Sequence, residues 1–244
     1  MTIKHSIKQF ALRQGIEIRR YDAAESADAR FARQLAHHGI ELVLDVGAND
    51  GGYGRLLRSL GYAGDIVSIE PLVDAHAALV AQAAADPRWF VAPRLALGDA
   101  AAEIEINVAG NSTSSSLLPM NALHERAAPQ SRYQGRQKVN VQRLDAFEHP
   151  AIAPARRTLL KIDTQGYELP VLRGAEGLLS QLNGVQVELS VAPLYDGQAL
   201  YREVVDFIVG RGFELWNLSP GFTDRASGRM LQFDGLFFRA PRRP

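Results

Sequence analysis

The sequence predicts an α/β fold, a mostly parallel β-sheet covered by helices, from three observations. Strand-like and helix-like patterns alternate along most of its 244 residues. The first strand pattern, in "ELVLDVGANDGGYGRLL" at 41–57, leads through a glycine-rich turn into a helix pattern. The last two strand patterns are joined by "SPGFTDRASGRML", which is too short for a crossover helix and therefore favours an antiparallel hairpin at the sheet edge.

The individual elements follow from hydrophobic periodicity along the chain. The expected strands are 41–46, 65–70, 89–97, 158–163, 185–190, 213–218 and 233–239. The expected helices are 27–38, 53–60, 73–85, 168–182 and 200–211. We interpret residues 1–38 as an N-terminal helical arm, in which a short basic stretch precedes a helix packed over the sheet edge. Residues 39–244 form the main domain.

Residues 103–141 interrupt the alternation of strands and helices. "EIEINVAG" and "QKVNVQRL" each alternate with period two, and the polar run "NSTSSSLLPM" lies between them. We interpret this region as an inserted antiparallel excursion beside the main sheet, not as a second domain. The serine-rich run is either a flexible linker or a loop that closes over a cleft.

Composition excludes several classes of protein. Lys plus Arg and Asp plus Glu each total 27, so the formal net charge is zero, which argues against a nucleic-acid partner. The absence of cysteine excludes disulfides and thiolate metal sites. No stretch has the roughly 20 apolar residues of a membrane span, and the N-terminus lacks the apolar core of a signal peptide. We therefore expect a cytoplasmic protein without a membrane span.

The turn after the first strand has the features of a nucleoside-binding turn. Ligands of open α/β sheets bind at the carboxyl ends of strands, where Asp45, Gly47, Asn49 and Gly51 stand. The dinucleotide pattern has glycine at its first, third and sixth positions, and here the third position is Asn49. No P-loop lysine follows the turn. Asp45 can organise the turn and attract the ammonium of an amino-acid moiety, which the glycines let the backbone approach. A purely structural turn is the alternative.

Two further strand ends extend this prediction. Glu70, followed by Pro71, ends the second strand, and it can accept hydrogen bonds from both hydroxyls of a ribose. An exposed strand-end acid is the alternative. The block "ALGD" places Leu97, Gly98 and Asp99 where an adenine ring can lie, with Asp99 either a partner of the adenine amino group or part of an ordinary turn.

Two long blocks, "LVLDVGANDGGYGRLLRSLGYAGDIVSIEPL" and "LLKIDTQGYELPVLRGAEGLL", resemble the FkbM-type S-adenosylmethionine-dependent methyltransferases. The resemblance continues through "NSTSSSLL", "VQVELSVAPLYDG" and "GRMLQFDGLFFR", and it includes the entry segment "QGIEIRRY". It therefore covers nearly the whole chain. Gln165 is a departure, because many relatives carry Glu in this block, and a second carboxylate there is in doubt.

The resemblance implies a class I methyltransferase (Rossmann-like) fold, a seven-stranded sheet whose last strand is antiparallel. It also implies S-adenosyl-L-methionine as cofactor and O-methylation of a hydroxyl of a sugar, glycan or natural-product small molecule. The partner is then this acceptor; a homo-oligomer is compatible with the sequence. The alternatives are an NAD-dependent oxidoreductase and a catalytically silent nucleoside-binding partner protein.

Carboxylates in and after the fourth and fifth strands are the candidates for chemistry. A positioned base helps an acceptor hydroxyl by removing its proton, and Asp163 ends the fourth strand at the cleft. Alternatively, Asp163 is a structural carboxylate beside Lys161. For Lys161 itself we expect a core ion pair. Glu188, in the apolar strand "VQVELSV", needs a partner or a function. Glu168 either serves the helix dipole or takes part in chemistry.

The acceptor prediction rests on the serine-rich loop and on two residues that follow predicted elements. Ser115 and Ser116 belong to the loop, His124 follows it, and Tyr195 in "APLYDG" follows the fifth strand as a candidate cleft wall. Core packing is the alternative for Tyr195. The six histidines show no metal-site spacing, so we predict no metal, although Asp163 and Glu188 can supply two ligands.

Overall fold

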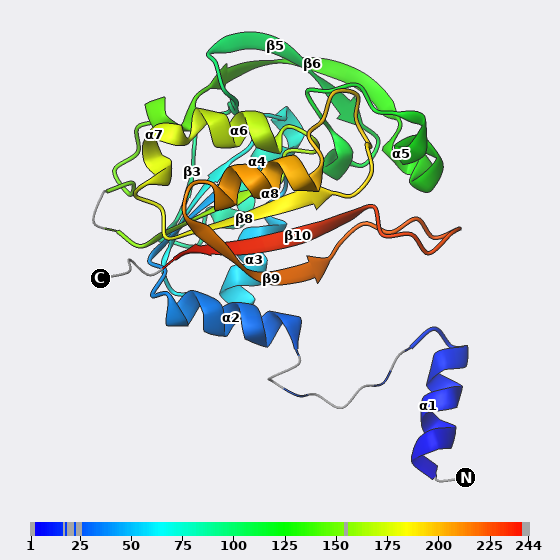
Figure 1. Ribbon diagram of the computed structural model, residues 1–244. Coiled ribbons are helices and arrows are strands. Elements are labelled where there is room, and N and C mark those ends of the chain that lie inside the picture. Colours follow the sequence, from blue (N-terminus) through cyan, green and yellow to red (C-terminus); the bar gives the residue numbers. More distant parts are fainter. Residues whose placement is uncertain (1–2, 17, 19–21, 23–25, 154–155, 241–244) are drawn as a thin grey trace.

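The computed structural model describes residues 3–16, 18, 22, 26–153 and 156–240, and its centre is a seven-stranded sheet (Figure 1). The strands are β1 (Leu42–Val46), β2 (Asp65–Ile69), β3 (Trp89–Val91), β7 (Thr158–Ile162), β8 (Gly184–Ser190), β9 (Phe213–Pro220) and β10 (Gln232–Arg239). Their order is β3-β2-β1-β7-β8-β10-β9. The first five pair in parallel, and β10 runs antiparallel to β8 and β9. The predicted α/β fold with a C-terminal edge hairpin is confirmed.

Helices cover both faces of this sheet. One face carries α2 (Ala27–His37), α3 (Gly52–Ser59) and α4 (Val73–Ala83), and the other carries α6 (Glu168–Gly174), α7 (Glu176–Leu179) and α8 (Tyr201–Val209). Successive residues of a strand point to opposite faces. Val43 therefore packs with the first group of helices and Leu44 with the second. Successive apolar residues of one strand thus belong to two separate hydrophobic cores, one on each face of the sheet.

Two predicted elements are each divided in the structure. The expected strand 89–97 is split into β3 and β4 (Ala96–Leu97), which belongs to a second sheet. Pro93 lies between them, and proline, which has no N–H to donate, is often found where a strand ends. The expected helix 168–182 breaks between α6 and α7. A side chain on Gly174 would lie 1.9 Å from the carbonyl oxygen of Gly98, so only glycine allows this close approach.

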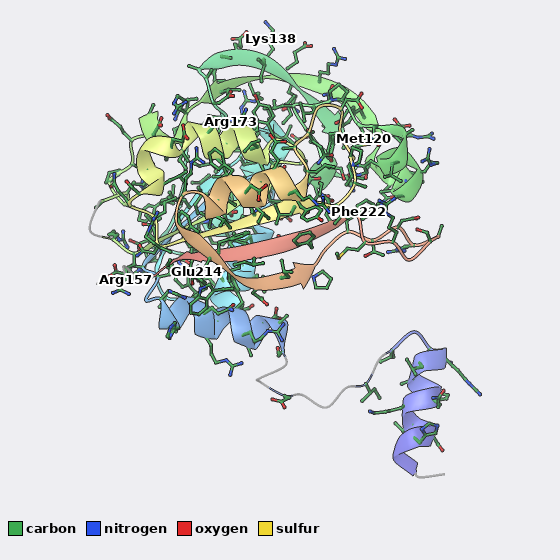
Figure 2. The ribbon with its side chains drawn as sticks, in the orientation of Figure 1. Met120, Lys138, Arg157, Arg173, Glu214 and Phe222 are labelled. Carbon is green, nitrogen blue, oxygen red and sulfur yellow. The ribbon has the colours of Figure 1, made fainter. Side chains whose placement is uncertain are left out.

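The region 103–141 forms most of a second, three-stranded sheet. Its order is β4-β6-β5, and β5 (Ala102–Ala109) pairs antiparallel with β6 (Tyr133–Gln142). Between these strands lie α5 (Ala122–Ala127) and two short 3-10 turns, Ser112–Ser114 and Pro129–Ser131; a third, Leu144–Ala146, follows β6. Lys138 points away from the body, as Figure 2 shows, whereas its neighbour Val139 is buried.

The N-terminal segment contains two helices, of which the sequence predicted only the second. α1 (Ile3–Arg13) stands apart from the sheet in Figure 1. α2 begins after Ser26, whose hydroxyl oxygen accepts a hydrogen bond from the Ala29 N–H at 3.3 Å. Just beyond the end of α2, the His38 ring stacks on Phe238 of β10 with centroids 3.6 Å apart. α2 is therefore held over the β9–β10 side of the sheet.

Candidate functional site

A cavity of about 410 Å³ opens at the carboxyl ends of the parallel strands. Its walls come from the glycine turn, from the ends of β2, β7 and β10, and from the second sheet with its loop. The lining residues are Val46, Gly47, Ala48, Asn49, Asp50, Gly52, Tyr53, Leu56, Ile69, Glu70, Pro71, Leu72, Leu95, Ala96, Leu97, Ile106, Ser112, Thr113, Ser115, Leu117, Lys161, Asp163, Thr164, Gln165, Tyr167, Gln186 and Asp234.

The glycine turn owes its residues first to packing. Gly47 has φ 76°, and a side chain there would lie 1.9 Å from the carbonyl oxygen of Asp163. Asn49 has φ 48°, a left-handed conformation that asparagine tolerates. Gly51 has φ 87°, and a side chain there would lie 3.1 Å from the Trp89 ring. The turn is thus pressed between the end of β7 and the Trp89 ring, and this fixes the position of its N–H groups.

Glu70 connects the turn to the end of β2. Its carboxylate accepts hydrogen bonds from the backbone N–H groups of Asn49 and Leu72, both at 2.8 Å. The side chain is buried, and this burial raises the pKa of Glu70 to about 7, although both hydrogen bonds act in the opposite direction. Glu70 lines the cavity, so its remaining lone pairs can accept hydrogen bonds from a ligand.

Asp45 lies beneath the turn and does not line the cavity. It is fully buried, accepts a hydrogen bond from the Ser68 hydroxyl at 3.1 Å, and forms an ion pair with Lys161 at 3.1 Å. The Lys161 Nζ also donates to the carbonyl oxygen of Gly47 at 3.3 Å. Asp45 therefore acts on the turn through Lys161, and the structure offers it no direct path to the ammonium of a bound amino acid.

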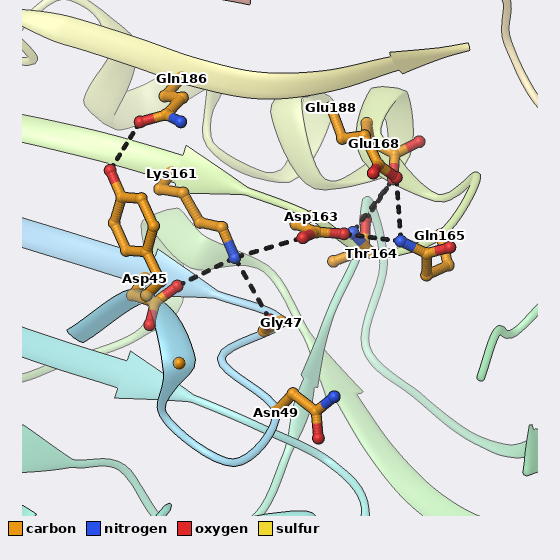
Figure 3. Close-up of polar contacts among 12 residues, drawn as sticks. Asp45, Gly47, Asn49, Lys161, Asp163, Thr164, Gln165, Glu168, Gln186 and Glu188 are labelled. Carbon is orange, nitrogen blue, oxygen red and sulfur yellow. Dashed lines mark hydrogen bonds and ion pairs between the residues drawn. The ribbon is translucent and has the colours of Figure 1, made fainter. Parts of the chain in front are cut away.

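Lys161 is the centre of a polar row that crosses one face of the sheet (Figure 3). Strand register aligns Ser68, Asp45, Lys161 and Gln186 on four adjacent strands. Burial alone would lower the pKa of the Lys161 ammonium, but the Asp45 and Asp163 carboxylates outweigh it and raise the pKa. The positive charge of Lys161 is thus compensated by the negative charges of Asp45 and Asp163. Buried charges require such partners. The sequence prediction of a core ion pair for Lys161 is confirmed.

Asp163 is the carboxylate of this network that reaches the cavity. Its side chain is 35% exposed, it lies 3.6 Å from the Lys161 Nζ, and it accepts a hydrogen bond from the Gln165 side-chain amide at 2.7 Å. Gln165 has φ 53° and donates a second hydrogen bond, at 2.9 Å, to Glu188. A lysine and an amide therefore fix the orientation of Asp163 toward the cavity.

Glu188 and Glu168 lie behind Asp163 and do not line the cavity. Glu188 accepts hydrogen bonds from the amides of Gln165 and Gln232, and burial, with Asp163 and Glu168 nearby, raises its pKa well above the usual value. Glu168 accepts hydrogen bonds from the Thr164 and Gly166 N–H groups, both at 3.0 Å, and burial raises its pKa to about 7. Through these hydrogen bonds Glu168 stabilises the loop that follows β7.

The structure separates the three residues predicted beside an adenine ring. Leu97 lines the cavity, among apolar neighbours that include Leu72, Ile106 and Tyr167. Gly98 packs against Tyr167 and does not line it. Asp99 is exposed, outside the lining, and its carbonyl oxygen accepts a hydrogen bond from Arg143 at 2.8 Å. The chain turns toward the second sheet here, which carries Asp99 away from the cavity.

Of the four predicted acceptor residues, only Ser115 lines the cavity. Ser116 is buried, and its hydroxyl donates to the carbonyl oxygen of Gln165 at 2.6 Å. His124 is 2% exposed, and burial lowers its pKa to about 4. Tyr195 is fully buried and donates its hydroxyl toward Gln165 and Ser114. These residues support the cavity from beneath, which agrees with the core-packing alternative for Tyr195.

The polar lining residues that the sequence-based prediction missed include Tyr53, Gln186 and Asp234. Gln186 and Asp234 each interrupt an apolar strand, and they lie on the same sheet face as Lys161. A period-two analysis of "GVQVELS" and "QFDGLFF" would have placed their side chains on that face. Among the described residues, no three His, Asp or Glu side chains gather as a metal site would require.

The strand order, the antiparallel strand β10 and the cavity at the parallel strand ends define a class I methyltransferase fold. A family model described as the methyltransferase FkbM domain matches residues 45–215. The chain belongs to the FkbM methyltransferase family. No curated protein matches it. Within the part of the chain that the structure describes, no helix is long and apolar enough to cross a membrane.

Three solved structures illustrate the fold similarity. A TehB-like SAM-dependent methyltransferase from Corynebacterium glutamicum is 12% identical, with 97% and 96% of the two chains covered and a TM-score of 0.44. An rRNA methylase from Streptococcus thermophilus is 11% identical, covered 89% and 98%, with a TM-score of 0.46. Sp1610 from Streptococcus pneumoniae, in complex with S-adenosyl-L-methionine, is 12% identical, covered 88% and 74%, with a TM-score of 0.45. The similarity concerns the fold and carries no argument about substrate.

Proposed function

We propose that this methyltransferase transfers the methyl group of S-adenosyl-L-methionine to a hydroxyl of a sugar, a glycan or a natural-product small molecule. One observation carries the proposal: Asp163 reaches the cavity at the end of β7, oriented by Lys161 and Gln165, beside the glycine turn. A hydroxyl is a poor nucleophile near neutral pH, and a fixed carboxylate is suited to orient it and accept its proton.

The cavity residues fit the parts of the cofactor. Glu70 offers a buried carboxylate for the ribose hydroxyls, and Leu72, Leu97 and Ile106 offer an apolar wall for the adenine ring. The Gly47 backbone lies next to Lys161 and Asp163, where the amino-acid end would be held. When bound, S-adenosyl-L-methionine supplies an electrophilic methyl group on a sulfonium. This chain then contributes positioning and a proton acceptor.

The contacts of Asn49 count against the alternative of an NAD-dependent oxidoreductase. Its side-chain oxygen accepts a hydrogen bond from the Ser112 hydroxyl at 2.9 Å, so a side chain and a loop occupy the place where a dinucleotide site needs open glycine backbone. We expect S-adenosyl-L-methionine or its demethylated product to bind with micromolar affinity and NAD not to bind. A catalytically silent protein would also bind the cofactor, so activity must decide.

The decisive experiment is transfer of a labelled methyl group. The purified protein is incubated with methyl-labelled S-adenosyl-L-methionine and a pool of glycosides and hydroxylated natural products, and the products are identified by mass. We expect a mass shift of one methyl group on a hydroxyl. Methylation of nitrogen, carbon or RNA in place of a hydroxyl would refute the O-methyltransferase assignment. Cofactor binding without any transfer would support the silent alternative.

We predict that Glu70→Gln weakens cofactor binding and removes its pH dependence. Ribose hydroxyls donate to the ionised carboxylate, whose pKa in the free protein is raised to about 7. Affinity for S-adenosylhomocysteine should therefore rise with pH through about 7 and level off above it. The variant should lose roughly 1.5 to 3 kcal/mol, as expected for hydrogen bonds to a charged group. Calorimetry across this pH range measures both effects.

Asp74→Asn is the matched control for Glu70. Asp74 is an exposed acid four residues later in the same segment. Its replacement should leave the affinity and its pH profile as in the parent protein. If Glu70→Gln shows the parent's affinity at every pH, Glu70 is not a cofactor ligand.

We predict that the methyl transfer does not depend on a divalent metal. The described residues contain no cluster of three metal-binding side chains, and Asp163 and Glu188 are already hydrogen-bonded by the Gln165 amide. Turnover in the presence of EDTA should equal turnover without it. Loss of turnover in EDTA that magnesium or manganese restores would instead make Asp163 and Glu188 candidate ligands.

A further inference from the structure

The polar wall beyond Asp163 is a part of the cavity to which the cofactor assignment gives no role. It is formed by Tyr53 from α3, Gln186 from β8 and Asp234 from β10. The four residues first predicted to hold the acceptor are all buried, and of them only Ser115 lines the cavity. The acceptor must nevertheless reach Asp163 from the open side of the cavity.

Asp234 is a mostly buried carboxylate that faces the cavity. Burial, with Asp163 nearby, raises its pKa to about 6. Within the described parts of the chain, no group donates a hydrogen bond to its oxygens, and none of these oxygens is sealed off from solvent. Partial burial still makes a carboxylate without a donor less stable than one in open water. A donor from a ligand would remove this cost.

Gln186 presents the complementary group next to Asp234. Asp234 pairs across the strands with Glu188, and Gln186 lies two residues earlier on the same face. The Tyr53 hydroxyl donates to the Gln186 side-chain oxygen at 2.6 Å, which fixes the amide. Its nitrogen makes no hydrogen bond with any residue that the structure describes, and it is not enclosed. The wall thus offers one fixed donor, the Gln186 amide nitrogen, beside one acceptor, the Asp234 carboxylate, that has no donor of its own among the described residues.

The charge of this wall disfavours an anionic ligand. Asp163 and Asp234 both face the cavity, and the single basic residue of the lining, Lys161, is already paired with Asp45 and Asp163. A carboxylate or phosphate brought here would meet two like charges at short range in a partly buried site, and no unpaired cation lies among the lining residues. A hydroxyl, by contrast, can accept from the amide and donate to the carboxylate.

We propose that Gln186 and Asp234 form the acceptor subsite, with Tyr53 as the residue that positions Gln186, and that this subsite binds an uncharged polyhydroxylated ring and rejects its anionic counterparts. The inference rests on the proposed function and assigns the neighbouring hydroxyls of the acceptor to the β8–β10 wall. The methylated hydroxyl then lies toward Asp163, and the hydroxyl beside it bridges Gln186 and Asp234.

Binding of matched sugar probes to the protein saturated with S-adenosylhomocysteine tests this assignment. The probes are methyl hexosides of several configurations and the corresponding methyl hexosiduronic acids, which differ only in the carboxylate. Affinities are measured by NMR titration. We expect at least one neutral hexoside to bind at least tenfold more tightly than its uronic acid. Asp234→Asn should weaken hexoside binding roughly tenfold and reduce this preference.

Two further variants separate recognition from folding. Tyr53→Phe keeps the ring but releases the Gln186 amide, so it should weaken hexoside binding while the melting temperature stays close to that of the parent. Glu214→Gln, which changes an exposed carboxylate on β9 (labelled in Figure 2), should leave both affinity and preference unchanged. In all variants the affinity for S-adenosylhomocysteine should stay within about twofold of the parent.

The outcomes distinguish this inference from the proposed function. Failure of S-adenosylhomocysteine to bind the parent protein would defeat the proposed function itself. If it binds but no hexoside does, or if uronic acids bind equally well, the subsite is wrongly assigned. If a folded Asp234→Asn variant binds the hexoside as tightly as the parent protein does, the subsite is also wrongly assigned.

Discussion

Asp163→Asn should lower methyl-transfer turnover by about 10²-fold or more, the usual contribution of a positioned proton acceptor. The amide keeps the shape of the carboxylate but cannot accept the acceptor's proton. The affinity for S-adenosylhomocysteine should change far less, because Glu70 and the glycine turn supply the contacts assigned to the cofactor. Single-turnover rates with the acceptor found by labelled transfer, together with calorimetry, measure the two quantities.

The melting temperature of the same variant decides between chemistry and structure. Asp163 also lies 3.6 Å from Lys161 and accepts a hydrogen bond from Gln165, so a purely structural role is physically reasonable. In that case the variant would melt earlier or lose cofactor affinity, and turnover would fall only in proportion. A stable, cofactor-binding Asp163→Asn protein with near-normal turnover would rule out the catalytic role.

Lys161→Met should destabilise the fold by about 3 to 5 kcal/mol, the expected cost of leaving a buried ion without its partner. Asp45 is fully buried and, among the residues that the structure describes, would keep the Ser68 hydroxyl as its one hydrogen-bond donor. Methionine keeps the apolar stem of the lysine but loses the ammonium, whose Nζ lies 5.2 Å from the centre of the Tyr53 ring. For a chain of this size the melting temperature should fall on the order of 10 °C, measurable by thermal denaturation.

A double variant tests whether the uncompensated charge is the cause. Lys161→Met combined with Asp45→Asn removes both charges, so it should be more stable than the sum of the two single changes predicts. Cofactor binding should fall in Lys161→Met even below the melting transition, since Lys161 also holds the Gly47 carbonyl. Additive effects of the two changes would show that the Lys161–Asp45 pair contributes little to stability.

Sequence patterns predicted the main sheet because its strands are short apolar runs separated by glycine-rich turns and helices. The failures have local causes. Strand 89–97 reads as continuous because its apolar pattern resumes after Pro93, although pairing with the main sheet ends before the proline and residues 96–97 belong to the second sheet. Helix 168–182 reads as continuous because nothing in its own residues shows that Gly174 must meet the Gly98 backbone.

Part of the candidate site could also be predicted from local sequence. Glu70, Asn49 and Asp163 stand at strand ends, and a parallel sheet brings its strand ends to one edge. The structure places all three on the cavity wall. Asp99 and Tyr195 occupy similar positions in sequence, but the chain carries Asp99 to the exposed surface and buries Tyr195 completely. Proximity to a strand end does not specify the direction of a side chain in a loop.

By itself, the sequence determined the fold class, the strand-end carboxylates and the zero net charge, because these depend on residue type and on periods of two and 3.6. The tertiary structure decided which polar residues share a face and which reach open space. Lys161, Gln186 and Asp234 come from three strands and meet only through register. Charge compensation and solvent access depend on such through-space neighbours. The polar wall beside Asp163, to which α3 adds Tyr53, therefore exists only in the folded protein.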